Sequence, residues 1–124
     1  MNSEYSKKVM KHFFHPKNMG EIKNPEAVGD IRNPICNDTM KVFLRIKDNR
    51  IKDIKFKTMG CAAAIASSDI TCELAKGKTL EKAKEISKKD ILKKLGGLPR
   101  LKEHCSLLGE GALKQAIENY EKSK

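Results

Sequence analysis

The chain has 124 residues, of which 39% are hydrophobic and 34% charged, so we expect residues 1–124 to form a single domain with one modest core. No window approaches the ~18 apolar residues of a membrane span, and the N-terminal segment lacks a signal peptide's apolar stretch, which favours a cytoplasmic protein. The net charge of +10 could attract nucleic acid, but the lysines are interleaved with acids and do not alternate with aromatics, which indicates a solvated surface instead.

The N-terminal segment is predicted to be a helix over residues 3–14. Its apolar residues recur at helical spacing, Ser3 is placed to cap its start, and His15 followed by proline is expected to end it. Residues 17–37 are rich in Asn, Pro and Gly and are predicted to be irregular, with a short strand near residues 27–31.

The middle of the chain predicts a hairpin. Residues 39–47 alternate between apolar and charged side chains, which is typical of a half-buried strand. A turn over residues 48–50 leads into a second strand over residues 51–58, with Ile54 and Phe56 expected to face inward. With the short preceding strand, this gives a small antiparallel sheet of about three strands.

Helices are predicted for most of the C-terminal half, over residues 62–76, 79–86, 90–95 and 100–121. Thr79 is expected to cap the second of them. Gly109 and Gly111 are expected to weaken the last, each by about 1 kcal/mol relative to alanine. The order of elements predicts an α+β fold of two layers, with the helices packed on one side of the sheet.

Three of the four cysteines lie at breaks between predicted elements. Cys36 is in the loop before the hairpin, Cys61 at the strand-to-helix junction, and Cys105 near the start of the last helix. Asp38 and His104 add oxygen and nitrogen donors beside them, which together suit a transition metal. Because long intervals separate the cysteines, the fold must assemble this site, unlike a zinc finger's local pairs. In a reducing compartment such cysteines indicate ligands more readily than disulfides.

The remaining candidates have simpler interpretations. Cys72 lies on the same predicted helix as Cys61, about 16 Å further along at 1.5 Å per residue, and is expected to be a core thiol. His12 and His15 are interpreted as structural or surface residues. For Asp38 the alternative to metal ligation is a turn-capping carboxylate, and for His104 it is a polar residue at a helix start.

The cysteine motifs resemble those of the IscU/NifU N-terminal family of iron–sulfur cluster assembly scaffolds. The resemblance spans nearly the whole chain and rests above all on three segments, Cys36-Asn37-Asp38, Gly60-Cys61 and His104-Cys105-Ser106. It implies a small antiparallel sheet with helices on one side. It also implies that Cys36, Cys61 and Cys105 are cluster ligands, with Asp38 or His104 in the remaining position.

The resemblance implies a scaffold, not an enzyme in the turnover sense. Such a scaffold assembles a transient 2Fe–2S cluster from iron and desulfurase-derived sulfur and transfers it to apo-proteins. Its partners would be a cysteine desulfurase and apo iron–sulfur recipient proteins, and it could be a monomer or a homo-oligomer. Two alternatives remain: a zinc-dependent sulfur acceptor like SufU, since the same donors would hold Zn²⁺, and a basic, zinc-stabilised nucleic-acid-binding module. His104 favours the IscU/NifU branch over SufU.

The chain departs from the family pattern in three places. Asn37 and Ala62 stand where the family usually has glycine. Asn is the non-glycine residue that best tolerates positive φ, so the loop at Asn37 is expected to survive. Residues 98–102 read Leu-Pro-Arg-Leu-Lys instead of the Leu-Pro-Pro-Val-Lys that a specialised Hsp70 chaperone reads, which argues against that chaperone as a partner.

Overall fold

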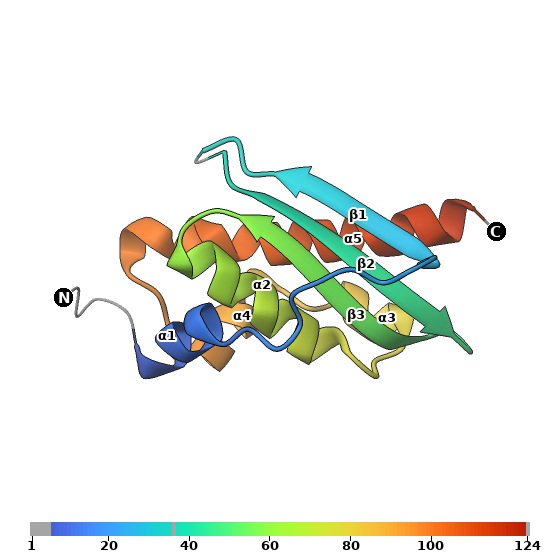
Figure 1. Cartoon of the computed structure of the whole chain (residues 1–124), viewed down its shortest axis with the longest axis horizontal. Coiled ribbons are helices and arrows are strands. Elements are labelled where there is room, and N and C mark those ends of the chain that lie inside the picture. The colour runs from blue at the N-terminus through green and yellow to red at the C-terminus, as the bar shows by residue number, and fades with distance from the viewer. Residues whose placement is uncertain (1–5, 36, 124) are drawn as a thin grey trace.

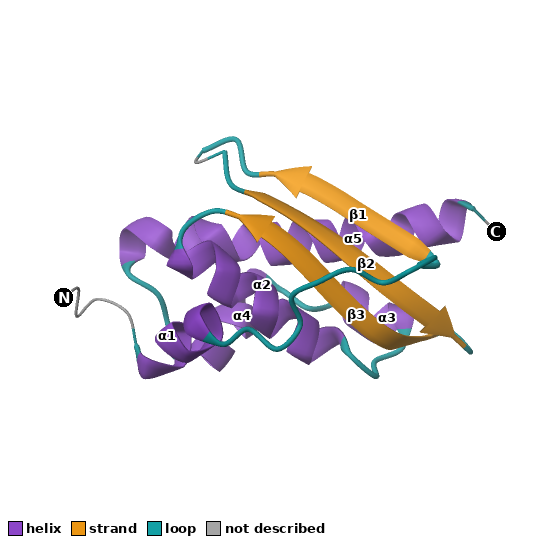
Figure 2. Ribbon diagram, viewed as in Figure 1, coloured by secondary structure: helices purple, strands orange, loops and turns teal. Residues whose placement is uncertain are grey.

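The computed structural model describes residues 6–35 and 37–123. Its elements, in chain order, are α1 (Lys7–Phe14), β1 (Ala27–Arg32), β2 (Thr39–Lys47), β3 (Arg50–Met59), α2 (Ala62–Ala75), α3 (Leu80–Lys84), α4 (Lys88–Leu95), the 3₁₀ helix η1 (Arg100–Cys105) and α5 (Ser106–Lys122). The strands form one antiparallel sheet in the order β1-β2-β3, and α2 and α5 pack against it (Figures 1 and 2). The predicted α+β fold is confirmed.

The hairpin of β2 and β3 forms as its alternation predicts. Asp48 and Asn49 make the turn with φ values of 54° and 62°, the left-handed geometry that a tight two-residue hairpin needs. A bulge in the register beside Arg45 leaves Lys52 unpaired. Because of this extra residue, Ile51 and Ile54 are both fully buried although they are three positions apart on a strand of period two.

The core lies between the sheet and the two long helices, and it continues to α3 and α4, which pack against those helices. Its fully buried large side chains are Met40, Leu44, Ile51, Ile54, Phe56, Ile70, Leu80, Ile91, Leu95, Leu108, Leu113 and Ile117. Cys72 is also fully buried, as expected for a core thiol. Within the residues described, no helix has the length and apolar character to cross a membrane.

Helix starts differ from the predicted ones where a better cap is available. The first helix begins at Lys7 because Ser6 accepts a hydrogen bond from the Val9 N–H at 3.2 Å; Ser3 lies outside the described residues. Thr79 caps α3 as predicted. Helix α4 begins two residues earlier than expected, because Ser87 and Asp90 form a reciprocal capping box.

The predicted helix over residues 100–121 is two helices. Lys102 donates its N–H to the Pro99 carbonyl at 2.8 Å, a contact between residues three apart that belongs to the tighter 3₁₀ geometry. The α-helical pattern starts only at Ser106. Cys105 therefore ends η1 and stands just before α5, instead of lying within the last helix.

Helix α5 approaches the sheet and α2 closely because of glycines. A Cβ atom at Gly109 would lie 1.9 Å from Thr71 Oγ1, and one at Gly111 would lie 2.5 Å from Ile31 Cδ1. Gly109, expected only to weaken the helix, thus permits its close packing on α2, whereas at Gly111 only the movable end of the Ile31 side chain is in the way. Helix α5 also occupies two backbone groups of the edge strand β1: Gln115 Oε1 accepts the Asp30 N–H at 2.7 Å, and the Asn119 side-chain nitrogen donates to the Val28 carbonyl at 2.9 Å. Occupied edge groups hinder pairing with a further strand.

Candidate metal centre

Three donor groups from separate segments meet at one end of the sheet. The Cys61 Sγ lies 3.8 Å from the Cys105 Sγ and 3.9 Å from Asp38 Oδ2. All three donor atoms lie within 4.8 Å of one another. Cys61 and Asp38 are half-buried, whereas Cys105 is 1% exposed. Cys36, the remaining cysteine of the predicted set, falls outside the described residues.

Asn33 organises the loop between β1 and β2 that carries Asp38. Its N–H donates to the Asp38 carbonyl and its own carbonyl accepts from the Asn37 N–H, both at 2.8 Å. Its side-chain oxygen accepts the Ile35 N–H at 2.8 Å, which forms an Asx turn. Its amide nitrogen donates to the His104 carbonyl at 3.2 Å. Sequence reasoning missed this residue, although an Asn-Pro pair before a polar loop is a turn signal.

The backbone of this site requires particular residue types at two positions. Asn37 has φ 61°, so the expected positive φ is confirmed at this position. Gly60 leaves space for the carboxylate: a Cβ there would lie 2.7 Å from Asp38 Cγ and 2.9 Å from the Ala64 Cβ. Asp38 can therefore reach Cys61 only because residue 60 has no side chain.

The Cys61 thiol is strongly acidified. The hydrogen bond from the Cys105 thiol, the N–H groups of Ala64 and Ala63 in the first turn of α2, and the charge of Lys102 lower its pKa to about 5, against the opposing effect of burial. Cys61 is the N-cap of α2, where free N–H groups and the helix dipole favour an anion. A thiolate is the form that both binds metals and attacks sulfur.

The main chain of His104 contacts the loop that carries Asp38. Its carbonyl receives the Asn33 side chain. Within the part of the chain that the structure describes, the donors clustered at this site are those of Asp38, Cys61 and Cys105, and the His104 ring is not among them. Ligation by His104 stays a prediction.

The low pKa of Cys61 leads to a prediction about how the reduced, metal-free protein is alkylated. With a pKa of about 5, Cys61 is already mostly thiolate at pH 6, so its rate with iodoacetamide should change little between pH 6 and 8. An ordinary cysteine thiol, with a pKa of about 8.5, reacts far more slowly at pH 6 than at pH 8. Peptide mapping by mass spectrometry measures the rate at Cys61 separately from the other cysteines.

The control for this measurement is Cys105→Ala, which removes the thiol that hydrogen-bonds to Cys61. We expect its Cys61 profile to move toward higher pH. Cys72 should stay unmodified in the folded protein, because it is fully buried and burial raises its pKa well above the usual value. An identical Cys61 profile in wild type and Cys105→Ala would show that the thiol pair does not set the acidity.

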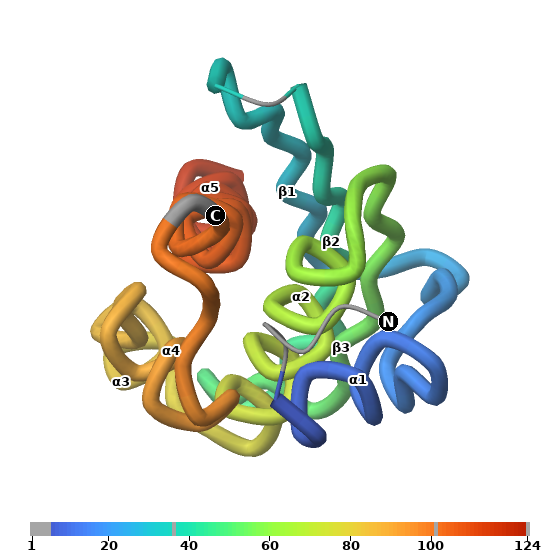
Figure 3. The backbone as a smooth tube through the Cα atoms, turned by 90° about the vertical axis from the view of Figure 1, so that its left-hand side faces the viewer, coloured from blue at the N-terminus to red at the C-terminus, as the bar shows by residue number. Residues whose placement is uncertain are grey.

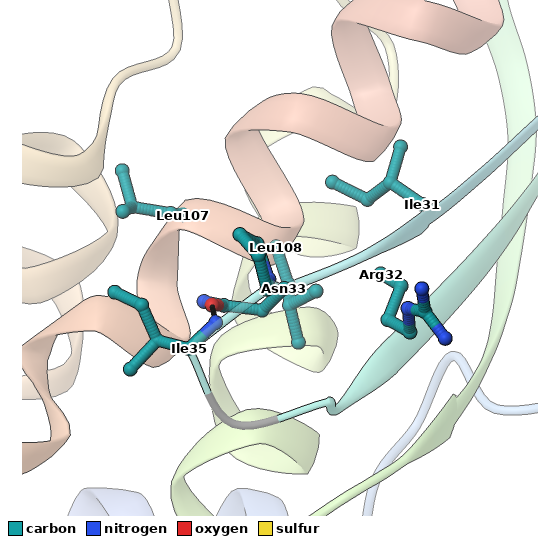
Figure 4. A pocket seen from close by; sticks show the side chains of 7 residues that line it. Ile31, Arg32, Asn33, Ile35, Leu107 and Leu108 are labelled. Carbon is teal, nitrogen blue, oxygen red and sulfur yellow. Dashed lines mark hydrogen bonds between the residues drawn. The ribbon is translucent and has the colours of Figure 1, made fainter.

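An apolar pocket of about 170 Å³ adjoins the loop that holds Asp38 (Figure 4). It is lined by Ile31, Arg32, Asn33, Pro34, Ile35, Leu107 and Leu108. Ile35 is 72% exposed, and Met59, which precedes Gly60, is 77% exposed. Large apolar side chains left in water beside a reactive group are typical of a surface that contacts another molecule.

The comparisons with known proteins agree with this arrangement. The family description "NifU-like N terminal domain" matches residues 4–124. The chain is 51% identical to the iron–sulfur cluster assembly scaffold protein IscU 1 of Archaeoglobus fulgidus over 116 residues, which cover 94% of this chain and 76% of that protein. It is 45% identical to the IscU scaffold protein of Rickettsia prowazekii over 124 residues, covering 97% and 94%.

Solved structures show the same fold at lower sequence identity. A NifU-like protein (N-terminal) from Brucella abortus superposes with a TM-score of 0.76 at 21% identity, covering 98% of this chain and 96% of that one. The SUF-system protein FiSufU from Fervidobacterium islandicum superposes with a TM-score of 0.75 at 24% identity, covering 94% and 99%.

Proposed function

Because the chain belongs to the family of the NifU-like N-terminal domain, we propose that it is a scaffold on which an iron–sulfur cluster is assembled and from which the cluster is passed on. It is then a carrier of cargo and not a turnover enzyme. The observation that best supports this is the acidified, half-exposed Cys61 beside Cys105 and Asp38. This group offers soft thiolates, one hard oxygen and access from solvent.

The proposed ligands are Cys36, Cys61 and Cys105, with Asp38 or His104 in the remaining position. Thiolates are the usual ligands of iron–sulfur clusters. A site with four of them would hold a cluster for storage, whereas an oxygen or nitrogen donor is a weaker match for iron in a sulfide cluster. Three thiolates and one such donor can therefore hold the cluster and still release it.

Sulfur delivery would use the same thiolate. A desulfurase presents sulfur as a cysteine persulfide, and the Cys61 thiolate attacks its outer sulfur. The new sulfur–sulfur bond forms on Cys61 as the old one breaks, and the desulfurase cysteine leaves as a thiolate. The exposed apolar side chains Ile35 and Met59 would contact such a partner. The apo iron–sulfur proteins that receive the cluster would approach the same end.

We further propose a 2Fe–2S cluster as the form held, with Zn²⁺ as an alternative occupant, since both suit a site rich in thiolates. The cytoplasm is the compartment we expect, because the cysteines must stay reduced. We also propose that residues 1–124 form a single domain. A partnership with a specialised Hsp70 chaperone is disfavoured, because residues 98–102 differ from the sequence that such a chaperone reads.

Anaerobic reconstitution with ferrous iron and sulfide tests the proposal against its rivals. A scaffold gains visible absorbance, and it binds about as much iron and acid-labile sulfide as one cluster contains for each site that is formed. A protein that stays colourless, retains zinc and still accepts persulfide sulfur would be a zinc-dependent sulfur acceptor instead. The third interpretation, a nucleic-acid-binding module, requires sequence-specific DNA binding that survives about 200 mM salt.

The Asp38 carboxylate gives a prediction about release. If its oxygen is the exchangeable ligand, the thiol of a recipient protein enters at that position. Asp38→Ala should then slow cluster transfer to apo-ferredoxin by about tenfold, which is the size of effect that loss of a group at a metal site commonly has. Cluster formation should persist, provided that His104 or another group fills the position. His104→Ala is the matched comparison. Transfer from Asp38→Ala at the wild-type rate, with slowed transfer from His104→Ala, would assign the exchangeable position to His104.

A further inference from the structure

A second group of donor side chains lies further along α2 than Cys61, where α1 packs against this helix (Figure 3). His12 comes from α1, and Asp69 and Glu73 come from α2, four residues apart and so on one face of that helix. The His12 Nδ1 atom lies 2.7 Å from Asp69 Oδ2 and 3.4 Å from Glu73 Oε2. The three donor atoms lie within 4.8 Å of one another.

The Asp69 carboxylate is held in place through one of its two oxygens. Its side chain is 0% exposed, and its Oδ1 accepts hydrogen bonds from the Asn18 N–H at 2.9 Å and from the Asn18 side-chain nitrogen at 3.0 Å. These two donors fix the plane of the carboxylate and leave Oδ2 facing His12 and Glu73. Such outer hydrogen bonds are what orient the ligands of metal sites in proteins.

The charge at this group is unbalanced. The chain has 26 Lys and Arg residues, yet among the residues described neither Asp69 nor Glu73 forms an ion pair with one of them; their only such partner is His12. Two carboxylates thus face a single imidazole, one of them without any exposure to water. A buried carboxylate needs both hydrogen bonds and a nearby positive charge; Asn18 supplies hydrogen bonds, and a bound cation would supply positive charge for both carboxylates.

We propose that His12, Asp69 and Glu73 form a second cation site, which binds a divalent transition metal such as Mn²⁺ or Fe²⁺ through one imidazole nitrogen and two carboxylate oxygens. Nitrogen and oxygen donors select such ions over the soft ones that thiolates select. Donors bound to one ion at 2.0–2.2 Å lie roughly 2.8–3.5 Å apart, close to the 2.7 and 3.4 Å separations in this structure. The metal takes the place of the hydrogen bond between His12 and Asp69.

This site is separate from the cysteine group. Asp69 lies eight residues beyond Cys61, about 12 Å along the helix at 1.5 Å per residue, so one ion cannot bridge the two. Because its ligands come from two helices, the bound ion joins α1 to α2. Any ion that binds only the folded chain stabilises it in proportion to the logarithm of its concentration. The site is thus a fold-stabilising cation site, independent of the cargo that the scaffold carries.

Mn²⁺ titration followed by electron paramagnetic resonance tests the proposal on the full chain, because this ion has little preference for thiolates. We expect saturable binding of one ion per chain, weakened by about tenfold or more in Glu73→Gln and in His12→Gln. Glu118→Gln, which makes the same charge change at an exposed position on α5, should leave the affinity within about twofold. Cys61→Ser should also leave it unchanged.

Glu73→Gln keeps the proposal testable if His12→Gln folds poorly, since Glu73 is 32% exposed and the His12–Asp69 contact remains without it. Mn²⁺ should raise the melting temperature of wild type but not of this variant. Three results would each overturn the proposal: no saturable binding up to about 1 mM Mn²⁺, equal affinity in wild type and both variants, or loss of binding in Cys61→Ser.

Discussion

Cys61→Ser and Cys105→Ser proteins are expected to hold no stable cluster after anaerobic reconstitution, with visible absorbance and acid-labile sulfide falling by about tenfold or more. A serine hydroxyl stays protonated at neutral pH and is a poor ligand for iron held with sulfide, whereas the Cys61 thiol is acidified to a pKa of about 5. Cys36→Ser should behave in the same way if Cys36 is the third thiolate ligand.

The matched control is Cys72→Ser, which makes the same chemical change on the same helix. Cys72 is fully buried and burial raises its pKa, so it offers no thiolate to a cluster. Reconstitution should reach the wild-type level, although the buried hydroxyl lowers stability by about 1 kcal/mol. Circular dichroism before reconstitution confirms that each variant is folded. Loss of the cluster in Cys72→Ser alone would refute the ligand assignment.

Gly29→Ala is expected to destabilise the fold by about 3 kcal/mol, the upper end of what overpacking costs. Gly29 lies on β1 beneath α5, and a Cβ atom there would lie 2.3 Å from the Ala112 carbonyl oxygen and 2.8 Å from the Ala116 nitrogen. Both are backbone atoms of a helix, which cannot rotate away as a side chain can. Helix α5 must therefore move off the sheet. Urea unfolding measures the loss, and the melting temperature should fall by roughly 10 °C.

Gly111→Ala provides the comparison for the same helix–sheet contact. The Cβ atom there would meet Ile31 Cδ1 at 2.5 Å, but this atom is the end of a flexible side chain that can adopt another rotamer. Alanine also gains about 1 kcal/mol of helix propensity over glycine. We expect a stability within about 1 kcal/mol of wild type. Equal losses for Gly29→Ala and Gly111→Ala would show that backbone contact is not what makes Gly29 necessary.

Local patterns in the sequence were sufficient to predict the helices and strands and part of the site. The alternation over residues 39–47 predicted β2, and capping and glycine signals placed most helices within a few residues, because both depend on neighbours along the chain. Cys61 and Cys105 were recognisable as candidates because they interrupt regular elements instead of following an apolar face. The motifs around them also predicted the family.

What only the tertiary structure decided are the contacts between distant segments. The approach of Asp38 to Cys61 requires the Asn33 loop and the absence of a side chain at Gly60, and the acidity of Cys61 requires Cys105. His12, interpreted from sequence as structural or surface, meets the buried Asp69 across 57 residues.

The glycines show the physical reason most directly. From sequence, Gly109 and Gly111 signal a weakened helix, because propensity is a property of the chain by itself. In the fold, Gly109 lies where a Cβ would collide with Thr71, and Gly29 lies where one would collide with α5. Propensity, capping and strand period act between neighbours and can be read along the chain, whereas steric exclusion, hydrogen bonds between distant segments and thiol acidity depend on which distant atoms the packed core brings together.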